Sequence, residues 1–284
     1  MKHLVVGVDG SAASAVALAW ATALGRDHDA ELTVVSAYQP VGSEVRPQYA
    51  ERVRDEHQRR LEGFCGSRLE GVRHRVEAIN GDPRDVLTQV AQQRDADLLV
   101  VASVGGSGHR PGFLAVGSVV EYLAHHLDRP LAVISPDAPP EITRVLVAVD
   151  GSTHSLLAVE WVRRLLDHGV PDAKLTAVAV DQPGLAIAPD APDAEWDTEA
   201  RRTISSRWAA PLADFGDSFT AVAVPESPVA EAILDVAADV DADLIVLGAR
   251  GLGGVTGLRI GGVALQVLHR TDRPLVLVPD DSID

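Results

Sequence analysis

A glycine-rich loop in the second half of the chain has the residue types of an anion site. It follows the apolar run 244–248, and its glycines are spaced Gly248-x2-Gly251-x9-Gly261. Glycine lets backbone N–H groups approach a phosphate closely, and a helix N-terminus adds partial positive charge. Helical spacing from Val263 onward places a helix start directly after the loop. Loop and helix start together predict a phosphate site made of backbone amides. A tight strand-to-helix turn without a ligand is the alternative.

The same unit occurs twice in the chain. Val6-Gly-Val-Asp9 returns as Val147-Ala-Val-Asp150, and Asp97-Leu-Leu-Val-Val returns as Asp243-Leu-Ile-Val-Leu. A period of more than 140 residues predicts two domains and not a solenoid of short repeats. We expect the boundary in the Pro-rich segment 135–140, which gives domains 1–138 (copy one) and 139–284 (copy two).

Apolar runs alternate with helix-like segments in both copies. This pattern predicts an α/β fold: two doubly wound, Rossmann-like parallel-sheet domains with right-handed crossovers and strand order 3-2-1-4-5. In that order the first and fourth strands are neighbours, so Asp9 and Asp150 come to lie beside the glycine loops. Each aspartate can accept hydrogen bonds from a base or ribose, or cap the following helix. The expected strands are 4–8, 32–35, 72–79, 97–101 and 130–134, then 144–149, 174–180, 218–224, 243–248 and 274–278.

Composition excludes several classes of function. With 25 basic and 41 acidic residues the net charge is −16, which disfavours nucleic acid and anionic membranes as partners. Cys65 is the single cysteine, so no intrachain disulfide forms and a reducing compartment is expected. The apolar run after Lys2 is short and ends at Asp9, which indicates a strand and not a signal peptide. We therefore expect a cytoplasmic protein.

The chain offers little sign of catalysis. The Gly-x4-Gly-Lys-(Ser/Thr) motif of P-loop NTPases is absent, and Gly105-Gly-Ser-Gly-His109 lacks the last glycine of a nucleophile elbow. His125 and His126 are sequence neighbours, so they point to different faces of a helix and do not share a metal ion. We expect neither a catalytic residue nor a metal ligand. Trp20 and Trp161 are expected in the core.

Together these motifs resemble those of the universal stress protein family in its tandem form, over nearly the whole chain. The resemblance is carried by the two Val-Asp-Gly-Ser segments, Gly81-Asp-Pro83, the glycine loops and the ending Arg-Pro-Leu-Val-Leu-Val at 273–278. It implies a non-catalytic stress-response protein that binds ATP, with or without Mg²⁺, in one or both domains. The tandem repeat with its Pro-rich linker predicts domains related by a pseudo-twofold axis. Strands 130–134 and 274–278 are expected to meet between them, because each would otherwise be an apolar sheet edge exposed to water. A homodimer stays possible.

Neither copy matches the family's Gly-x2-Gly-x9-Gly-(Ser/Thr) pattern completely. Copy two has Gly262 at the hydroxyl position, and copy one has Ala102 at the first glycine and a longer loop. The intact glycine spacing favours copy two as the better ATP site. The resemblance implies base packing on Ala37 or Val180 and a ligand-side glycine at Gly81, which we match to Glu226 in copy two. The binding residues that it implies are Asp9, Ala37, Gly81, Ala102, Gly105, Gly117, Ser118 and Val119 in copy one, and Asp150, Val180, Gly248, Gly251, Gly261, Gly262 and Val263 in copy two.

Two other classes of function stay open. The substitutions Ala102 and Gly262 favour an interaction module whose degenerate sites hold no nucleotide. A slow ATP hydrolase of related fold is the third hypothesis, although no base, nucleophile or carboxylate pair stands near the loops.

Overall fold

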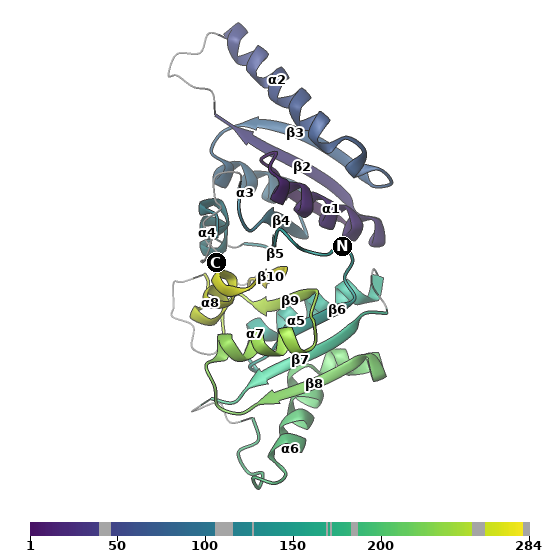
Figure 1. Cartoon of the computed structure of the whole chain (residues 1–284), viewed down its shortest axis with the longest axis vertical. Coiled ribbons are helices and arrows are strands. Elements are labelled where there is room, and N and C mark those ends of the chain that lie inside the picture. Colours follow the sequence, from purple (N-terminus) through teal and green to yellow (C-terminus); the bar gives the residue numbers. More distant parts are fainter. Residues whose placement is uncertain are drawn as a thin grey trace. The chain divides into compact units, whose positions relative to one another are not determined.

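The computed structural model describes residues 1–39, 47–105, 116–126, 128–168, 170, 172–182, 187–251 and 259–280. The chain divides into two compact units, which are Met1–Leu123 with Leu131–Glu141 and Ala124–Pro130 with Ile142–Asp284. Strands and helices alternate in each unit, and all strand pairs within each unit's described sheet are parallel (Figure 1).

The sheet of copy one has the order β3-β2-β1-β4-β5, which confirms the predicted topology. Each expected strand is present, with ends shifted by up to three residues. The elements are β1 (His3–Gly7), α1 (Ala12–Asp27), β2 (Glu31–Tyr38), α2 (Pro47–Cys65), a 3-10 turn (Gly66–Leu69), β3 (Arg73–Asn80), α3 (Pro83–Gln93), β4 (Leu98–Ala102), α4 (Ser118–His125) and β5 (Leu131–Ile134).

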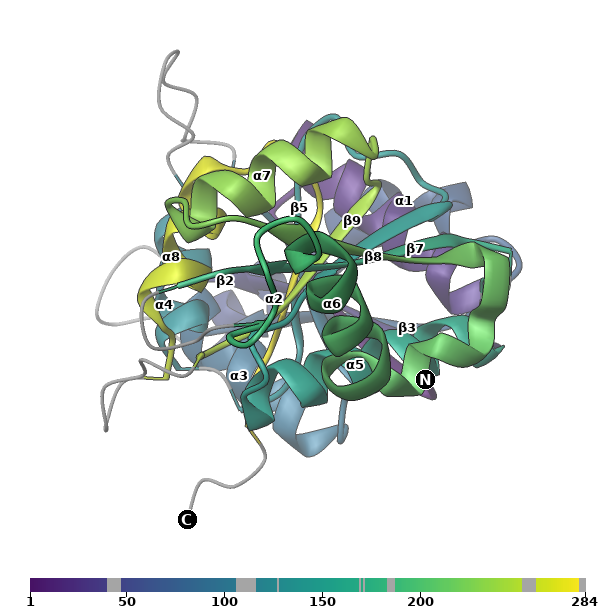
Figure 2. The same ribbon diagram turned by 90° about the horizontal axis from the view of Figure 1, so that it is seen from below.

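The sheet of copy two repeats this order as β8-β7-β6-β9-β10. Right-handed crossovers place α5 and α6 on one face and α7 and α8 on the other. Accordingly α5 packs on β9 and β10, α7 packs on α8, and Figure 2 shows α6 and α7 on opposite sides of β8. The elements are β6 (Arg144–Ala148), α5 (Thr153–His168), β7 (Lys174–Val180), α6 (Trp196–Thr203), a π-helical turn (Ile204–Trp208), a 3-10 segment (Ala210–Ser218), β8 (Phe219–Val224), α7 (Val229–Asp239), β9 (Leu244–Gly248), α8 (Gly262–Arg270) and β10 (Leu275–Val278).

The central strands are buried on both faces because helices cover the sheet from both sides. The inner positions of β1, β4, β6 and β9 are all buried. Trp20 and Trp161 are 1% and 3% exposed, so the prediction that both belong to the core is confirmed. Cys65 is buried at the end of α2.

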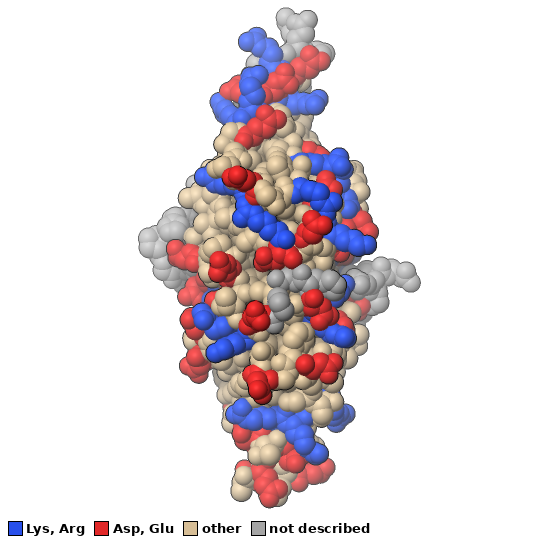
Figure 3. Space-filling view, turned by 90° about the vertical axis from the view of Figure 1, so that its right-hand side faces the viewer, with Lys and Arg blue, Asp and Glu red and all other residues tan. Residues whose placement is uncertain are grey.

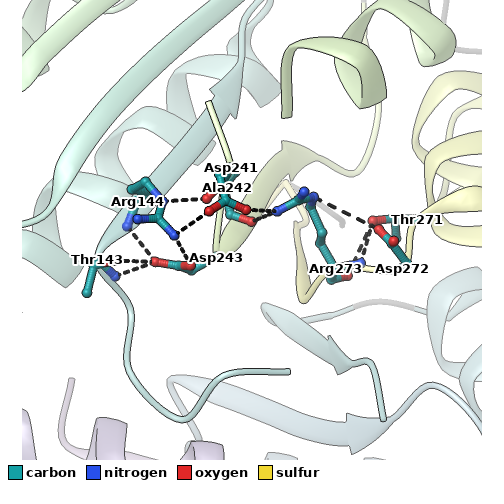
Figure 4. A network of polar contacts seen from close by, with 8 residues as sticks. All are labelled: Thr143, Arg144, Asp241, Ala242, Asp243, Thr271, Asp272 and Arg273. Carbon is teal, nitrogen blue, oxygen red and sulfur yellow. Dashed lines mark hydrogen bonds and ion pairs between the residues drawn. The ribbon is translucent and has the colours of Figure 1, made fainter. Parts of the chain in front are cut away.

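An Asp-Ala-Asp segment occurs in both copies, at 95–97 and 241–243. Its second aspartate binds backbone N–H groups at the start of the first strand of its copy. Asp95 and Asp241 have φ of 47° and 49°, a left-handed turn that aspartate tolerates better than most residues. In copy two, Asp243 Oδ2 then accepts hydrogen bonds from Thr143 N (2.8 Å) and Arg144 N (2.9 Å). The Arg144 guanidinium pairs with Asp241 and Asp243 as well (Figure 4).

In copy one the start of the first strand is held by a carboxylate in the same way, with fewer side chains involved. Asp97 Oδ2 accepts hydrogen bonds from Lys2 N (2.5 Å) and His3 N (2.9 Å). The carboxylate replaces the strand partner that these N–H groups lack at the amino edge of the sheet. Both copies thus hold their first strand in a fixed register, which positions the opposite, carboxyl edge.

Side chains also cover the outer strand of each sheet. Gln58 of α2 receives a hydrogen bond from Ala78 N through Oε1 and donates one from Nε2 to Val76 O, both at 2.9 Å. Its amide thereby imitates the peptide group of a further strand beside β3. On β8, Arg201 Nη1 donates to Ala221 O at 2.8 Å.

Acidic and basic side chains are mixed on the protein surface. On the face drawn in Figure 3, Lys and Arg lie interspersed with Asp and Glu. Among the described residues, no helix has both the length and the apolar character needed to cross a membrane.

Candidate functional site

The carboxyl ends of β1 and β4 bring Asp9 and Gly105 into contact in copy one. Asp9 Oδ1 accepts a hydrogen bond from Ser11 N at 3.0 Å, which closes the turn before α1. A Cβ on Gly105 would come within 2.9 Å of Asp9 Oδ2, so this glycine leaves room for the carboxylate. One carboxylate oxygen therefore has the structural role expected of a turn aspartate, and the other faces the glycine loop.

Copy two repeats this contact between Asp150 and Gly251. Asp150 Oδ1 accepts from Ser152 N at 2.9 Å, and a Cβ on Gly251 would come within 2.5 Å of Asp150 Oδ2. The strand order thus brings the aspartate and the glycine loop together in both copies. Residues 106–115 and 252–258 of the two loops lie outside the described residues.

The last glycine of each loop closes it onto the preceding strand. Gly117 N donates to Ser103 O at 2.9 Å, and Gly261 N donates to Ala249 O at 2.7 Å. Gly261 was expected among the ATP-binding residues, and its N–H is bonded within the loop itself. Its φ is −85°, so its backbone conformation does not require glycine.

The helix starts supply the amide groups that point out of each loop. Gly117 and Gly261 accept the first helical hydrogen bonds, from Glu121 N and Leu265 N, so α4 begins at Ser118 and α8 at Gly262. The N–H groups of a first turn have no partner within the helix. Ser118 is exposed, and a Cβ on Gly262 would meet no atom of the described residues within 4 Å. As far as the described residues go, both helix starts are open to an anion, and only copy one adds a hydroxyl.

The first glycine of the pattern has a packing role in copy two. A Cβ on Gly248 would come within 2.6 Å of the carbonyl oxygen of His154, at the start of α5. Copy one has Ala102 at this position, at the end of β4. Gly248 is thus explained by helix packing alone, and it does not favour copy two as a ligand site.

The two residues expected to pack on a base occupy the same place in their sheets. Val35 and Val178 accept hydrogen bonds from Val8 N and Val149 N, and Ala37 and Val180 each lie two residues further on. Ala37 is half-buried and Val180 is 6% exposed. Both lie one strand away from the aspartate.

Gly81 stands at the end of the neighbouring strand and donates from its N to Tyr38 O at 2.9 Å. Its φ of +154° and the approach of Val86 Cγ2, 2.8 Å from a built Cβ, both require glycine. Copy two has four residues between β8 and α7, where copy one has two between β3 and α3. The two loops therefore differ in length, and the match of Glu226 to Gly81 stays a prediction.

A group of three titratable or charged side chains in copy two was not foreseen. Arg250 Nε donates to His154 Nε2 at 3.2 Å, and Asp280 Oδ2 lies 3.5 Å from the same nitrogen. Burial, followed by the charge of Arg250, holds the pKa of His154 below its usual value of 6.5, against the opposing effects of Asp280 and Asp150. The three residues come from distant parts of the sequence.

Two apolar side chains near the copy-two site were also missed. Trp208 Nε1 lies 2.8 Å from a Cβ built on Gly151, whereas no described residue comes within 4 Å of one on Gly10 in copy one. Ile187 is 3% exposed, and its N donates to Asp181 Oδ1 at 2.9 Å, directly after β7. The aspartate turn of copy two is therefore more covered than that of copy one.

A metal site would need a cluster of ligand side chains among the described residues. No three His, Cys, Asp or Glu side chains in this part of the chain are placed to hold an ion together. A nucleotide-bound Mg²⁺ keeps several waters and needs only one or two protein carboxylates. Asp9 and Asp150 are the carboxylates that face the glycine loops.

Comparison with known proteins identifies relatives along the whole chain. The model of the universal stress protein family matches residues 1–135 and 141–279. Two universal stress proteins of Mycobacterium tuberculosis are 28% and 29% identical, over 98% and 96% of this chain and 96% and 95% of their own. The crystal structure of a universal stress protein from Archaeoglobus fulgidus has a TM-score of 0.74 at 19% identity, and covers 97% of each chain.

Proposed function

The chain belongs to the universal stress protein family, and from that premise we propose that it binds ATP at the carboxyl edge of one or both of its α/β domains. The nucleotide acts on conformation and is not turned over. It favours one arrangement of the loops and domains to the extent that it binds that arrangement more tightly. The protein is then a cytoplasmic, nucleotide-dependent regulatory module, in which pairing of the two domains within the chain takes the place of a dimer.

The observation that carries this proposal is the convergence of three features, which occurs twice. An aspartate, a glycine loop and an open helix start meet at the ends of the first and fourth strands in both copies. A ligand in an open α/β sheet binds at this switch in strand order. The sequences around the two sites differ, yet the aspartate-to-glycine contact is kept in both.

Each feature has a separate part in binding ATP. The N–H groups of Ser118 and Val119, or of Gly262 and Val263, face the phosphates at the positive end of the helix dipole. The aspartate oxygen beside the glycine loop accepts from the ribose or base. Because the net charge is −16, the phosphates are held by these local groups against the field of the whole protein.

Mass spectrometry of the purified protein is the first test. The full-length protein is denatured after gel filtration, and the released small molecules are identified. An adenine nucleotide in the released fraction supports the proposal. If none is released, and calorimetry with ATP up to millimolar concentration gives no heat of binding, the proposal is wrong.

Two variants of the full chain assign the binding to a copy. Gly105→Val and Gly251→Val each place side-chain atoms against the aspartate oxygen of one copy only. We expect each variant to remove the binding of its own copy and to leave the other unchanged. Calorimetric stoichiometry of the parent, the two single variants and the double variant distinguishes one site from two.

A nucleotide-free interaction module is the second candidate. Gly262, which lacks the family hydroxyl, and the cover of Trp208 and Ile187 favour it for copy two. Under this hypothesis Gly251→Val leaves the ATP stoichiometry of the full chain unchanged.

A further inference from the structure

One imidazole nitrogen in copy two lies between a hydrogen-bond donor and an acceptor. His154 Nε2 is 3.2 Å from Arg250 Nε and 3.5 Å from Asp280 Oδ2. The three residues come from the first turn of α5, the loop after β9 and the segment after β10. The side chains of His154 and Asp280 are only 16% and 17% exposed, so water competes weakly for these contacts.

The protonation state of His154 decides which neighbour it can bond. A neutral imidazole with the proton on Nδ1 has a lone pair on Nε2 and accepts from Arg250. A protonated imidazole donates from Nε2 to Asp280 and has no lone pair left for Arg250. The two bonds therefore exclude each other at this nitrogen.

We propose that His154 is a positioning residue for the glycine loop of copy two, which it ties to α5 through Arg250 when neutral and releases when protonated. Its effect on ligand affinity rests on the proposed ATP binding, whereas the exchange of partners does not. Histidine suits this role because its charge changes close to neutral pH.

Both ends of this link are part of the site itself. Arg250 is the residue before Gly251, which faces the Asp150 carboxylate, and a Cβ on Gly261 would be 3.3 Å from Arg250 Cα. At the other end, the His154 backbone packs on Gly248. Release of the link thus removes the contact that holds Arg250, and with it Gly251, to the start of α5.

The charged groups around His154 set the pH at which release occurs. Arg250 lowers the pKa of His154, while Asp280 and Asp150 raise it, and burial is the largest effect and lowers it. The link is therefore closed at neutral pH and opens in acid, below 6.5. In copy one Ala13, four residues after Asp9, corresponds to His154. Val104, the residue before Gly105, corresponds to Arg250. Neither side chain can form such a link.

The exchange of partners is tested first without a ligand. The His154 ring is titrated by NMR in the full-length protein and identified by its loss in His154→Gln. Arg250→Met should raise the pKa of His154, because it removes a cation and a donor. Asp280→Asn should lower it. If neither variant moves the pKa, the proposal is overturned.

The second test measures ATP affinity by calorimetry at pH 7.5 and 5.5, with Gly105→Val present to silence copy one. We expect about two- to fivefold weaker binding at pH 5.5, and a similar loss in His154→Ala at pH 7.5. Glutamine can accept from Arg250 and donate to Asp280 without titrating, so His154→Gln should restore most of the affinity and remove the extra pH dependence.

The titration of ATP itself cancels in this comparison, because both proteins bind the same ligand. If the ATP affinity depends equally on pH with His154 and with His154→Gln, both in the Gly105→Val background, the proposal is overturned. If ATP binds neither protein, the proposed function fails for copy two, and the NMR titration still decides the partner exchange.

Discussion

The carbonyl oxygen of His154 lies directly against Gly248, where a Cβ on the glycine would come within 2.6 Å. The close approach of α5 to β9 therefore depends on the absence of a side chain at this strand end. Copy one accommodates Ala102 at the corresponding position.

Gly248→Ala is therefore expected to destabilise copy two. The methyl group would meet backbone atoms, which cannot move without shifting the helix, and overpacking of this kind costs about 1–3 kcal/mol. Urea unfolding of the full chain measures the loss. Ala102→Gly is the matched change in copy one and should cost about 0.5–1 kcal/mol, the usual loss for glycine in a strand. A cost for Gly248→Ala no greater than this would contradict the packing argument.

Gly262→Ser is expected to tighten ATP binding to copy two. The position has space for a side chain, and serine adds a hydroxyl donor at the start of α8. A neutral hydrogen bond contributes about 0.5–1.5 kcal/mol, so the affinity should rise about two- to tenfold. Ser118→Gly in copy one is the reverse change and should weaken binding there. Calorimetry of both variants checks the pair, and an unchanged affinity in both would exclude a hydroxyl contact.

Gly261→Val is expected to weaken ATP binding more than Arg250→Ala at neutral pH. A Cβ at 261 would be 3.3 Å from Arg250 Cα, so the larger valine must distort the loop that presents the helix start. The Arg250 side chain is directed to His154, and loss of one partly exposed contact costs about 1 kcal/mol or less. Should Arg250→Ala abolish binding while Gly261→Val preserves it, the phosphates are held by a cation and not by backbone amides.

Cys65 is expected to resist alkylation in the folded protein. Burial raises the pKa of its thiol to about 11, and the thiolate is the reactive form. At pH 8 iodoacetamide should label the native protein far more slowly than the protein in urea. Intact-mass spectrometry follows the reaction, and equal rates in both conditions would show that the thiol is accessible.

Stability is expected to fall as the pH drops below 6.5, and His3 contributes to this fall. Burial lowers the pKa of His3, so the unfolded chain binds its proton more readily than the folded protein does. The contribution of His3 is present above 6.5 and is lost as the pH falls toward its lowered pKa. Urea midpoints between pH 7.5 and 5 should therefore depend less on pH in His3→Gln. A steeper dependence in the variant would reverse the sign.

Much of the fold could be predicted because most strands are apolar runs that end in a turn residue, whereas β3 shows only an alternating pattern. The repeat of Asp9 as Asp150 shows which motifs of copy one and copy two correspond. The strand order followed from the alternation of strands and helices. The contact of each aspartate with its loop glycine then follows from that order. These inferences depend only on local pattern and on general rules of sheet topology.

The parts that could not be predicted depend on contacts across the fold. His154, Arg250 and Asp280 are far apart in the sequence, and no local pattern joins them. The use of the Gly261 N–H by Ala249 O depends on how the loop closes. The loop after β8 has two more residues than the loop after β3, and no local sequence pattern shows where β8 ends.

The Gln58 amide also bears on how the chain behaves among copies of itself. An incoming strand that paired with β3 would compete for Ala78 N and Val76 O, which Gln58 already bonds. A partly unfolded neighbour must first displace this side chain before it can extend the sheet. Gln58 therefore disfavours pairing of β3 with a strand of another copy, the step by which a sheet extends into a fibril. It does so without adding charge to an already acidic protein.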